Sequence, residues 1–297
     1  MIHLPKYLLA TACMCFAVAL AAEPPAHKRI VSIGPNVTET ICALGARDRL
    51  VGVSEFCSYP PEVKKLRQVG GPANPRFETI SALRPDLIVM QFATPAVRSF
   101  AAERGIELAE VHMDTIATIE RDIGRLGALL GREDAAASIT TRMRRDLDEL
   151  RRRVARIPEA GRPLVFLSVE RQGGSLAGVL TASDRSFLGE ALALAGGRNA
   201  FGDDPRLYGE VSRERLVARR PEVILELRGH EVTDGRERDR LVRDWDAMAS
   251  LPAVANKKIY VLGGEDLLVP GPRLARTVRA IHDAIYSSLG RSTTSTW

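Results

Sequence analysis

The sequence is poor in the residues and motifs that mark most enzymes and metal sites. Aromatic residues make up 5% of its 297 positions, and there are four cysteines and five histidines. The motifs G-x-S-x-G, G-x-x-x-x-G-K and H-E-x-x-H do not occur, which excludes a nucleophile elbow, a phosphate loop and a zinc-protease helix. We therefore expect no catalytic residues, no resident cofactor and no metal site. A hydrolase or metalloenzyme remains the competing functional class, without a motif to support it.

Long apolar runs are also scarce, and the one that occurs is at the N-terminus. Residues 7–20 are apolar, follow Lys6 and end in a small-x-small cleavage site at 19–21. This pattern predicts a cleaved signal peptide over residues 1–22 and a periplasmic protein. The run is shorter than the roughly 20 residues of a spanning helix. A retained anchor, or a lipoprotein through Cys13, is the weaker alternative.

The charge balance favours no nucleic-acid partner. The formal net charge is +5, and the loss of Lys6 with the leader lowers it by one. The arginines are spread among acidic residues rather than gathered with aromatics, and export separates the protein from nucleic acid. We expect a solvated surface of mixed charge.

Two cysteines, Cys42 and Cys57, remain after the leader is removed. In an oxidising compartment we expect them to form a disulfide, with a buried thiol and a loop thiol as the alternative. They lie too far apart, without a nearby histidine pair, to suggest zinc.

The stretch from Glu133 to Ile157 predicts one long helix. Its apolar residues recur at steps of three or four, which places them on one face. The other face is charged, and Asp148 with Arg152, like Glu149 with Arg153, is one helical turn apart. The helix lies between two halves of α/β pattern, so we predict a rigid connection over residues 132–158. Periodicity alone fits a surface helix of one domain equally well.

Strands and helices alternate in both halves, which predicts mostly parallel sheets covered by helices. The fold class is therefore α/β, with two Rossmann-like lobes at 28–131 and 163–290 joined by the long helix, and with a loose tail at 291–297. The first half has expected strands at 29–33, 50–54, 86–90 and 107–111, and helices at 38–44, 77–83, 101–104 and 116–130. The second half has expected strands at 163–169, 222–227 and 258–262, and helices at 186–195, 212–218, 240–249 and 273–289.

One sequence pattern occurs in both halves. A glutamate stands seven residues before a proline that separates a helix from an apolar strand, at Glu78 and Pro85 and again at Glu214 and Pro221. This echo predicts two lobes of similar build, related by a pseudo-twofold. The two glutamates either stabilise their helix N-termini or dock onto basic residues of a twofold-symmetric partner.

Loops that follow strands are where open α/β sheets bind ligands. Four of the few aromatic residues fall in such loops: Phe56, Tyr59, Phe92 and Tyr208. Flat rings there suit a large, partly apolar ligand, although for Phe56 and Phe92 the simpler expectation is packing within their own loops. The polar residues in such loops are Gln91, Arg171 to Gly174, Gly229-His230 and Gly263 to Asp266.

Several segments, taken together and in order, resemble the periplasmic binding proteins of ABC importers for cobalamin, haem and ferric siderophores. The resemblance runs from about Arg29 to Leu289 and is strongest to the cobalamin binders. The segments are Arg29-Ile-Val-Ser-Ile-Gly-Pro-Asn-Val-Thr-Glu-Thr40, Ala43-Leu-Gly45, Leu50-Val-Gly-Val53, Cys57-Ser-Tyr-Pro-Pro61, Leu83-Arg-Pro-Asp86, Val211-Ser-Arg-Glu214 and Pro270-Gly-Pro-Arg273.

The resemblance implies a monomeric receptor that holds cobalamin or a related corrinoid between two lobes with little hinge closure. Haem or a ferric siderophore is the alternative ligand, and a scaffold of the same fold that has lost transport is a third option. It implies that Glu78 and Glu214 engage arginines on an ABC permease dimer. The residues implied to face the ligand are Tyr59, Gln91, Arg171, Tyr208 and Glu265, with His230 or either tyrosine as an iron ligand if the cargo is haem.

Overall fold

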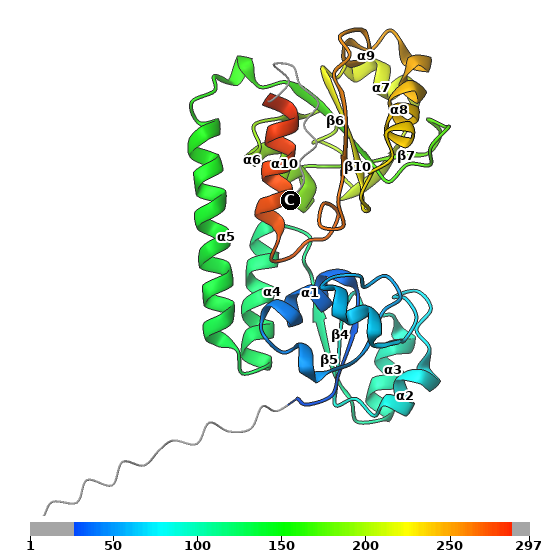
Figure 1. Ribbon diagram of the computed structural model, residues 1–297, viewed down its shortest axis with the longest axis vertical. Helices are drawn as coiled ribbons and strands as arrows, with labels where there is room; N and C mark the ends of the chain where they lie inside the picture. The colour runs from blue at the N-terminus through cyan, green and yellow to red at the C-terminus, as the bar shows by residue number, and fades with distance from the viewer. Residues whose placement is uncertain (1–26, 287–297) are drawn as a thin grey trace, which may run out of the picture.

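The computed structural model describes residues 27–286, which form two lobes beside one long helix (Figure 1). The predicted signal peptide at 1–22 and the tail at 291–297 lie outside the described residues. Within 27–286, no helix combines the length and apolar character needed to cross a bilayer.

The N-terminal lobe is built on a five-stranded sheet in which every pairing is parallel. Its order is β3-β2-β1-β4-β5. Alternate residues of the central strands enter two apolar clusters, Leu87 and Val89 on one face and Ile88 and Met90 on the other. Burial on both faces explains why these strands read as continuous apolar runs. The elements are β1 (Ile30–Ile33), α1 (Pro35–Ala43), β2 (Leu50–Val53), β3 (Arg67–Gln68), α2 (Phe77–Leu83), β4 (Leu87–Gln91), α3 (Pro95–Glu103), β5 (Glu107–Val111) and α4 (Ile116–Leu129).

The C-terminal lobe has a mixed sheet of order β11-β10-β6-β7-β9, with β8 paired to β6. Strands β6, β8, β10 and β11 are parallel, whereas β7 is antiparallel to both β6 and β9. Strands β7 and β9 were not expected from the sequence, because four-residue strands without an apolar run leave no periodic signal. The elements are β6 (Leu164–Val169), β7 (Val179–Ala182), α6 (Phe187–Leu194), β8 (Arg198–Asn199), β9 (Tyr208–Val211), α7 (Arg213–Arg219), β10 (Val223–Arg228), α8 (Gly235–Arg243), α9 (Pro252–Ala255), β11 (Ile259–Gly263) and α10 (Leu274–Tyr286).

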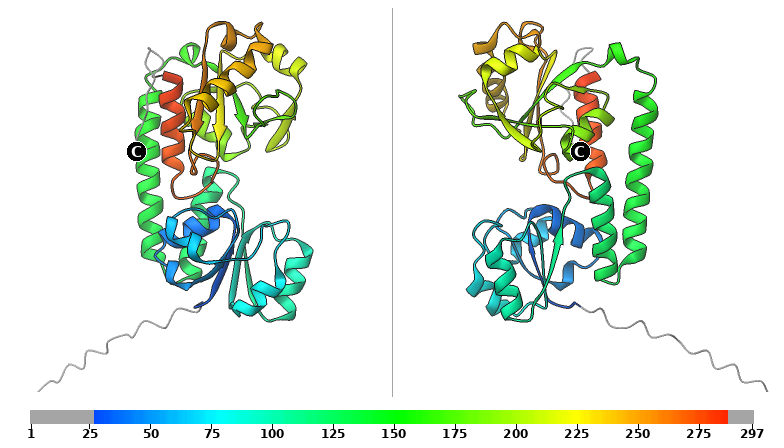
Figure 2. Two further views of the ribbon diagram at one scale, coloured as in Figure 1. Left: turned by 45° about the vertical axis from the view of Figure 1, so that its right-hand side comes forward. Right: turned by 180° about the vertical axis from the view of Figure 1, so that it is seen from behind.

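The long helix is α5 (Glu133–Val154), and it spans both lobes. It packs against α4 of the N-terminal lobe and against α6 and α10 of the C-terminal lobe, as the three views agree (Figures 1 and 2). Its buried residues Met143, Leu147 and Leu150 belong to one apolar cluster that continues into both lobes. The helix therefore connects the two lobes and is not a surface helix of one domain, which confirms the predicted fold class.

One close contact joins α4 to α5, and one hydrogen bond joins α6 to α4. A Cβ atom at Gly127 of α4 would lie 2.5 Å from the Cβ of Ala136, so the close crossing of α4 and α5 requires glycine there. The carboxylate of Glu190 on α6 accepts a hydrogen bond from the backbone N–H of Ile116, at 2.6 Å, and so joins the lobes at the start of α4. On α5, Asp148 pairs with Arg151 rather than with the predicted partner one turn on.

The repeated sequence pattern produces the same local path in both lobes. Helices α2 and α7 are capped by the residues that follow them, Arg84 and Arg220, whose φ values of 46° and 51° are left-handed. Each is followed by proline and then by a strand, β4 beside β1 and β10 beside β6. The similar build predicted for the lobes holds at this position.

Both described cysteines are free thiols, so the predicted disulfide is not formed. The buried sulfur of Cys57 lies 3.0 Å from the Thr38 hydroxyl and 3.1 Å from the Ser54 hydroxyl. These two hydroxyls occupy the hydrogen-bonding positions around the sulfur. Burial raises the pKa of the Cys42 thiol to about 12, which disfavours the thiolate at neutral pH.

Candidate functional site

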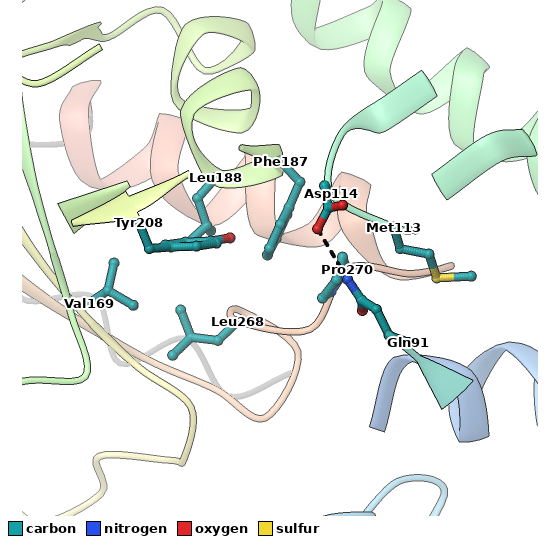
Figure 3. A pocket seen from close by; sticks show the side chains of 9 residues that line it. All are labelled: Gln91, Met113, Asp114, Val169, Phe187, Leu188, Tyr208, Leu268 and Pro270. Carbon is teal, nitrogen blue, oxygen red and sulfur yellow. Dashed lines mark hydrogen bonds between the residues drawn. The ribbon is translucent and has the colours of Figure 1, made fainter. Parts of the chain in front are cut away.

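A cavity of about 270 Å³ lies between the two lobes, and both contribute to its wall (Figure 3). The N-terminal lobe supplies residues from the carboxyl ends of β4 and β5, as expected for an open parallel sheet. The C-terminal lobe supplies the end of β6, the start of α6, the start of β9 and the segment before α10. The lining residues are Gln91, Met113, Asp114, Val169, Phe187, Leu188, Tyr208, Leu268 and Pro270.

The N-terminal wall is polar, and its hydrogen bonds set the orientation of Gln91. The amide oxygen of Gln91 accepts a hydrogen bond from Asn36 Nδ2 at 2.7 Å, and its Nε2 donates to Asp114 Oδ1 at 3.1 Å. Asn36 is buried at the start of α1. Burial raises the pKa of the Asp114 carboxyl, although the charge on His112 and the Gln91 amide oppose this shift. The wall therefore has an acidic group that is hydrogen-bonded to Gln91, and Asn36 in turn orients Gln91.

The C-terminal wall is apolar and carries two rings, Tyr208 and Phe187 (Figure 3). Tyr208 is 38% exposed, and β9 holds it through its pairing with Ala182 of β7. Desolvation raises the pKa of the Tyr208 phenol, so the hydroxyl stays neutral. A wall of this kind can stack on a flat apolar ligand and offer it one neutral hydroxyl.

The sequence from residue 30 to residue 265 matches the family model described as periplasmic binding protein. The chain belongs to this family. It is 28% identical over 277 residues to the vitamin B12-binding protein of Vibrio cholerae, covering 92% of this chain and 95% of that protein. The fold agrees with the crystal structure of the periplasmic vitamin B12-binding protein of Vibrio cholerae, with a TM-score of 0.74, 25% identity and coverage of 89% of this chain and 99% of that one. A periplasmic haem-binding protein from Pseudomonas aeruginosa also has a TM-score of 0.74, with 26% identity and coverage of 90% and 96%.

Two of the residues expected to face a ligand, Gln91 and Tyr208, line the cavity from opposite lobes of this periplasmic binding protein. Tyr59 and Glu265 are not among the nine lining residues. Tyr59 is 38% exposed, and the Arg273 guanidinium carbon lies 3.9 Å from its ring centroid. Arg273 in turn forms an ion pair with Glu39 across the lobes, at 2.6 Å. Tyr59 therefore lies at the junction between the lobes, and Glu265 is half-buried in the loop after β11.

The prediction that Arg171 faces the ligand is wrong, because its side chain is fully buried. Its guanidinium pairs with Glu226 of β10, lies 2.8 Å from Asp244 and donates to the Leu241 carbonyl at 2.7 Å. The sequence places Arg171 in a loop after a strand. It does not reveal that the acidic residue on the neighbouring strand points inward and draws the arginine below the surface.

His230, the other basic residue expected at the ligand, does not line the cavity either. It is exposed, and its Nε2 lies 3.4 Å from Glu237 of α8. Among residues 27–286, no group of three or more histidine, cysteine or acidic side chains is arranged to hold a metal ion.

Sequence reasoning missed the other seven lining residues, among which Asp114 is the most informative. It follows β5 and directly precedes Thr115, the N-cap of α4. Since residues after parallel strands were the expected ligand positions, this strand end was a signal that could have been used. The apolar residues Phe187 and Leu188 gave no such signal, because they read as the buried face of a helix.

Two further rings, Phe56 and Phe92, are 61% and 51% exposed. Phe92 contacts the His112 ring at a centroid distance of 5.0 Å, and a Cβ at Gly71 would lie 2.8 Å from the Phe56 ring. Both contacts are with a neighbouring loop, because Gly71 follows β3 and His112 follows β5, and each ring presents more than half of its surface to solvent. Packing of the two rings within their own loops stays a prediction.

Glu78 and Glu214 are exposed in the first turns of α2 and α7. Backbone and Ser212 hydrogen bonds lower the pKa of Glu214, which keeps it ionised. Helices α2 and α7 lie on the side of the two lobes away from α5 (Figure 1).

Proposed function

We propose that this periplasmic binding protein is the receptor of an ABC importer that captures cobalamin or a related corrinoid between its lobes. The observation that carries the proposal is the cavity, to which both lobes contribute and whose C-terminal wall presents Tyr208 and Phe187. The similarity to vitamin B12-binding proteins supports the choice of a corrinoid. The chelate is cargo, and the receptor is a periplasmic monomer without a catalytic role.

The proposed ligand would protrude from the cavity. Its volume of about 270 Å³ is just below the range of roughly 300–1,000 Å³ of small-molecule sites. A corrinoid is larger, so part of it would extend beyond the cavity. The exposed rings of Phe56, Tyr59 and Phe92 follow strands of the N-terminal lobe and offer apolar surface for that part.

Haem is the alternative cargo, favoured by the similarity to the haem-binding protein of Pseudomonas aeruginosa. A tyrosine binds ferric iron as phenolate. Of the three side chains expected as iron ligands, His230 and Tyr59 are not among the residues that line the cavity, which leaves Tyr208 alone. A ferric siderophore with acidic groups would need a basic partner, and Arg171 is buried against Glu226. These features favour a corrinoid.

Delivery to the permease is proposed to use Glu78 and Glu214. They are exposed acidic groups at equivalent positions of the two lobes. Equivalent positions in two similarly built lobes suit a permease dimer that presents basic residues with twofold symmetry.

Titration of the purified protein with cyanocobalamin, haemin and a ferric hydroxamate, followed by visible absorption, tests the ligand. We expect saturable binding of cyanocobalamin in preference to the other two. Tyr208→Ala should raise the Kd for cyanocobalamin by about tenfold, since stacking on a ring contributes about 1 kcal/mol or more. Tyr208→Phe is the matched control, which keeps the ring and should stay near wild type. Saturation by haemin alone would replace the corrinoid proposal with the haem alternative.

A further inference from the structure

Asp114 gives the cavity an acidic group, and His112, the basic side chain whose charge acts on it, lies outside the cavity lining. It is the one residue with a carboxylate among the nine that line the cavity, and those nine include no lysine, arginine or histidine. The nearby Arg273 is paired with Glu39 at 2.6 Å and lies 3.9 Å from Asp266. The ring of His112 lies against Phe92. A ligand that enters the cavity therefore meets negative charge on the N-terminal wall.

The hydrogen bonds of this wall leave an acceptor, and not a donor, available to a ligand. Gln91 uses its amide oxygen to accept from Asn36 and its Nε2 to donate to Asp114 Oδ1. Among the described residues, Oδ2 of Asp114 has no hydrogen-bond partner, and it is not one of the buried unsatisfied atoms. Figure 3 shows Asp114 in the cavity lining, with one carboxylate oxygen on the hydrogen bond to Gln91. Oδ2 of Asp114 is thus the charged acceptor that is available to a ligand.

We propose that Asp114 is a specificity-determining residue, which selects chelates that present N–H donors, such as peripheral carboxamides, and disfavours chelates that present carboxylates. This assignment rests on the proposed function, because a corrin ring carries primary carboxamides along its edge whereas haem carries two propionates.

Two physical effects act in the same direction. A hydrogen bond from an amide N–H to an ionised carboxylate is stronger than one between neutral groups. A ligand carboxylate placed beside Asp114 meets like-charge repulsion in a partly desolvated cavity, where the attraction of a basic side chain is missing from the lining. The hydrogen bond from Gln91 already orients the Asp114 carboxylate, so this side chain loses little conformational entropy when a ligand binds.

The test compares cyanocobalamin with its three monocarboxylic acids, in each of which one peripheral carboxamide is hydrolysed. These probes differ from the parent by one group, so the corrin ring and its metal stay constant. For the wild-type protein at neutral pH, we expect at least one of the acids to bind about tenfold more weakly or worse. For Asp114→Asn we expect weaker binding of cyanocobalamin and a ratio between acid and parent that falls toward one.

The matched control is Asp134→Asn, an equal charge change at an exposed residue in the first turn of α5. It should leave both Kd values and their ratio unchanged, which separates a local effect from one of net charge. The wild-type comparison needs no variant, so it stands even if Asp114→Asn folds poorly.

The outcomes separate this assignment from the proposed function. If the wild-type protein binds cyanocobalamin but binds all three acids equally well, the assignment to Asp114 is refuted and the corrinoid receptor stands. The assignment is refuted in the same way if Asp114→Asn keeps the wild-type ratio. If the wild-type protein binds no corrinoid, the proposed function fails and this assignment fails with it.

Discussion

Replacing Arg171 with methionine tests whether this side chain supports the C-terminal lobe or contacts the ligand. In the structure the guanidinium is fully buried, pairs with Glu226 and donates to the Leu241 carbonyl at 2.7 Å. Methionine has a similar length and fills the space without the charge. The variant leaves Glu226 buried, with Ser168 at 3.0 Å and Trp245 Nε1 as its remaining hydrogen-bond donors.

Removing one partner of a buried ion pair costs about 3–5 kcal/mol, because the other charge stays desolvated. We therefore expect Arg171→Met to lower the free energy of unfolding by about this amount, while the folded protein keeps wild-type affinity for cyanocobalamin. Adding Glu226→Gln should recover most of the loss, since it removes the stranded charge and keeps an acceptor for Trp245. Arg236→Met, at an exposed position of α8, is the control and should change stability by less than about 0.5 kcal/mol.

The loss of stability in Arg171→Met should also depend on pH. Burial raises the pKa of Glu226 above its ordinary value of 4.5, and Arg171 opposes this shift. Without Arg171 the pKa in the folded state rises further, whereas the pKa in the unfolded chain does not. The unfolded chain then holds fewer protons between these two values, so stability falls as the pH rises through that window. The deficit of the variant should be smaller at pH 5 than at pH 8.

Urea unfolding followed by tryptophan fluorescence measures these effects. Trp245 is fully buried and donates to Glu226, so it reports on this part of the lobe. The second tryptophan, Trp297, lies outside the described residues and is removed by Trp297→Phe in every variant. A variant with wild-type stability and a weakened affinity for cyanocobalamin would refute the argument and return Arg171 to the ligand site.

Two further predictions concern docking and the connecting helix. Changing both Glu78 and Glu214 to lysine should abolish uptake of cyanocobalamin by cells. The Kd of the purified receptor should stay near wild type, because both side chains are exposed and neither lines the cavity. Uptake at the wild-type rate would contradict the docking proposal. Leu147→Ala should lower the free energy of unfolding by about 2–5 kcal/mol, since Leu147 is fully buried between α5 and the lobes, whereas Arg142→Ala on the exposed face should have little effect. If the two substitutions lower the free energy of unfolding equally in urea, the role of α5 as the packed connection between the lobes would be contradicted.

The sequence by itself determined the elements whose signals are local. The apolar period of α5 gave its start at Glu133, although the helix ends at Val154 and not at the predicted Ile157. The expected helix at 77–83 and strand at 107–111 match α2 and β5. The motifs, read in order along the chain, were sufficient for the family. Such signals come from residues a few positions apart, so they can be read from the sequence without tertiary information.

Only the tertiary structure decided which side chains meet. Arg171 and Glu226 are 55 positions apart, and Glu39 and Arg273 are 234 positions apart, yet each pair is in contact. Whether a residue at a strand end faces a cavity or turns inward depends on the charge carried by the neighbouring strand. That neighbour is set by sheet order, and sheet order is fixed by packing of the whole lobe. Packing also brings Asp114 beside Gln91, 23 positions away, and Cys57 beside the Thr38 hydroxyl, 19 positions away, while Cys57 and Cys42 stay unbonded.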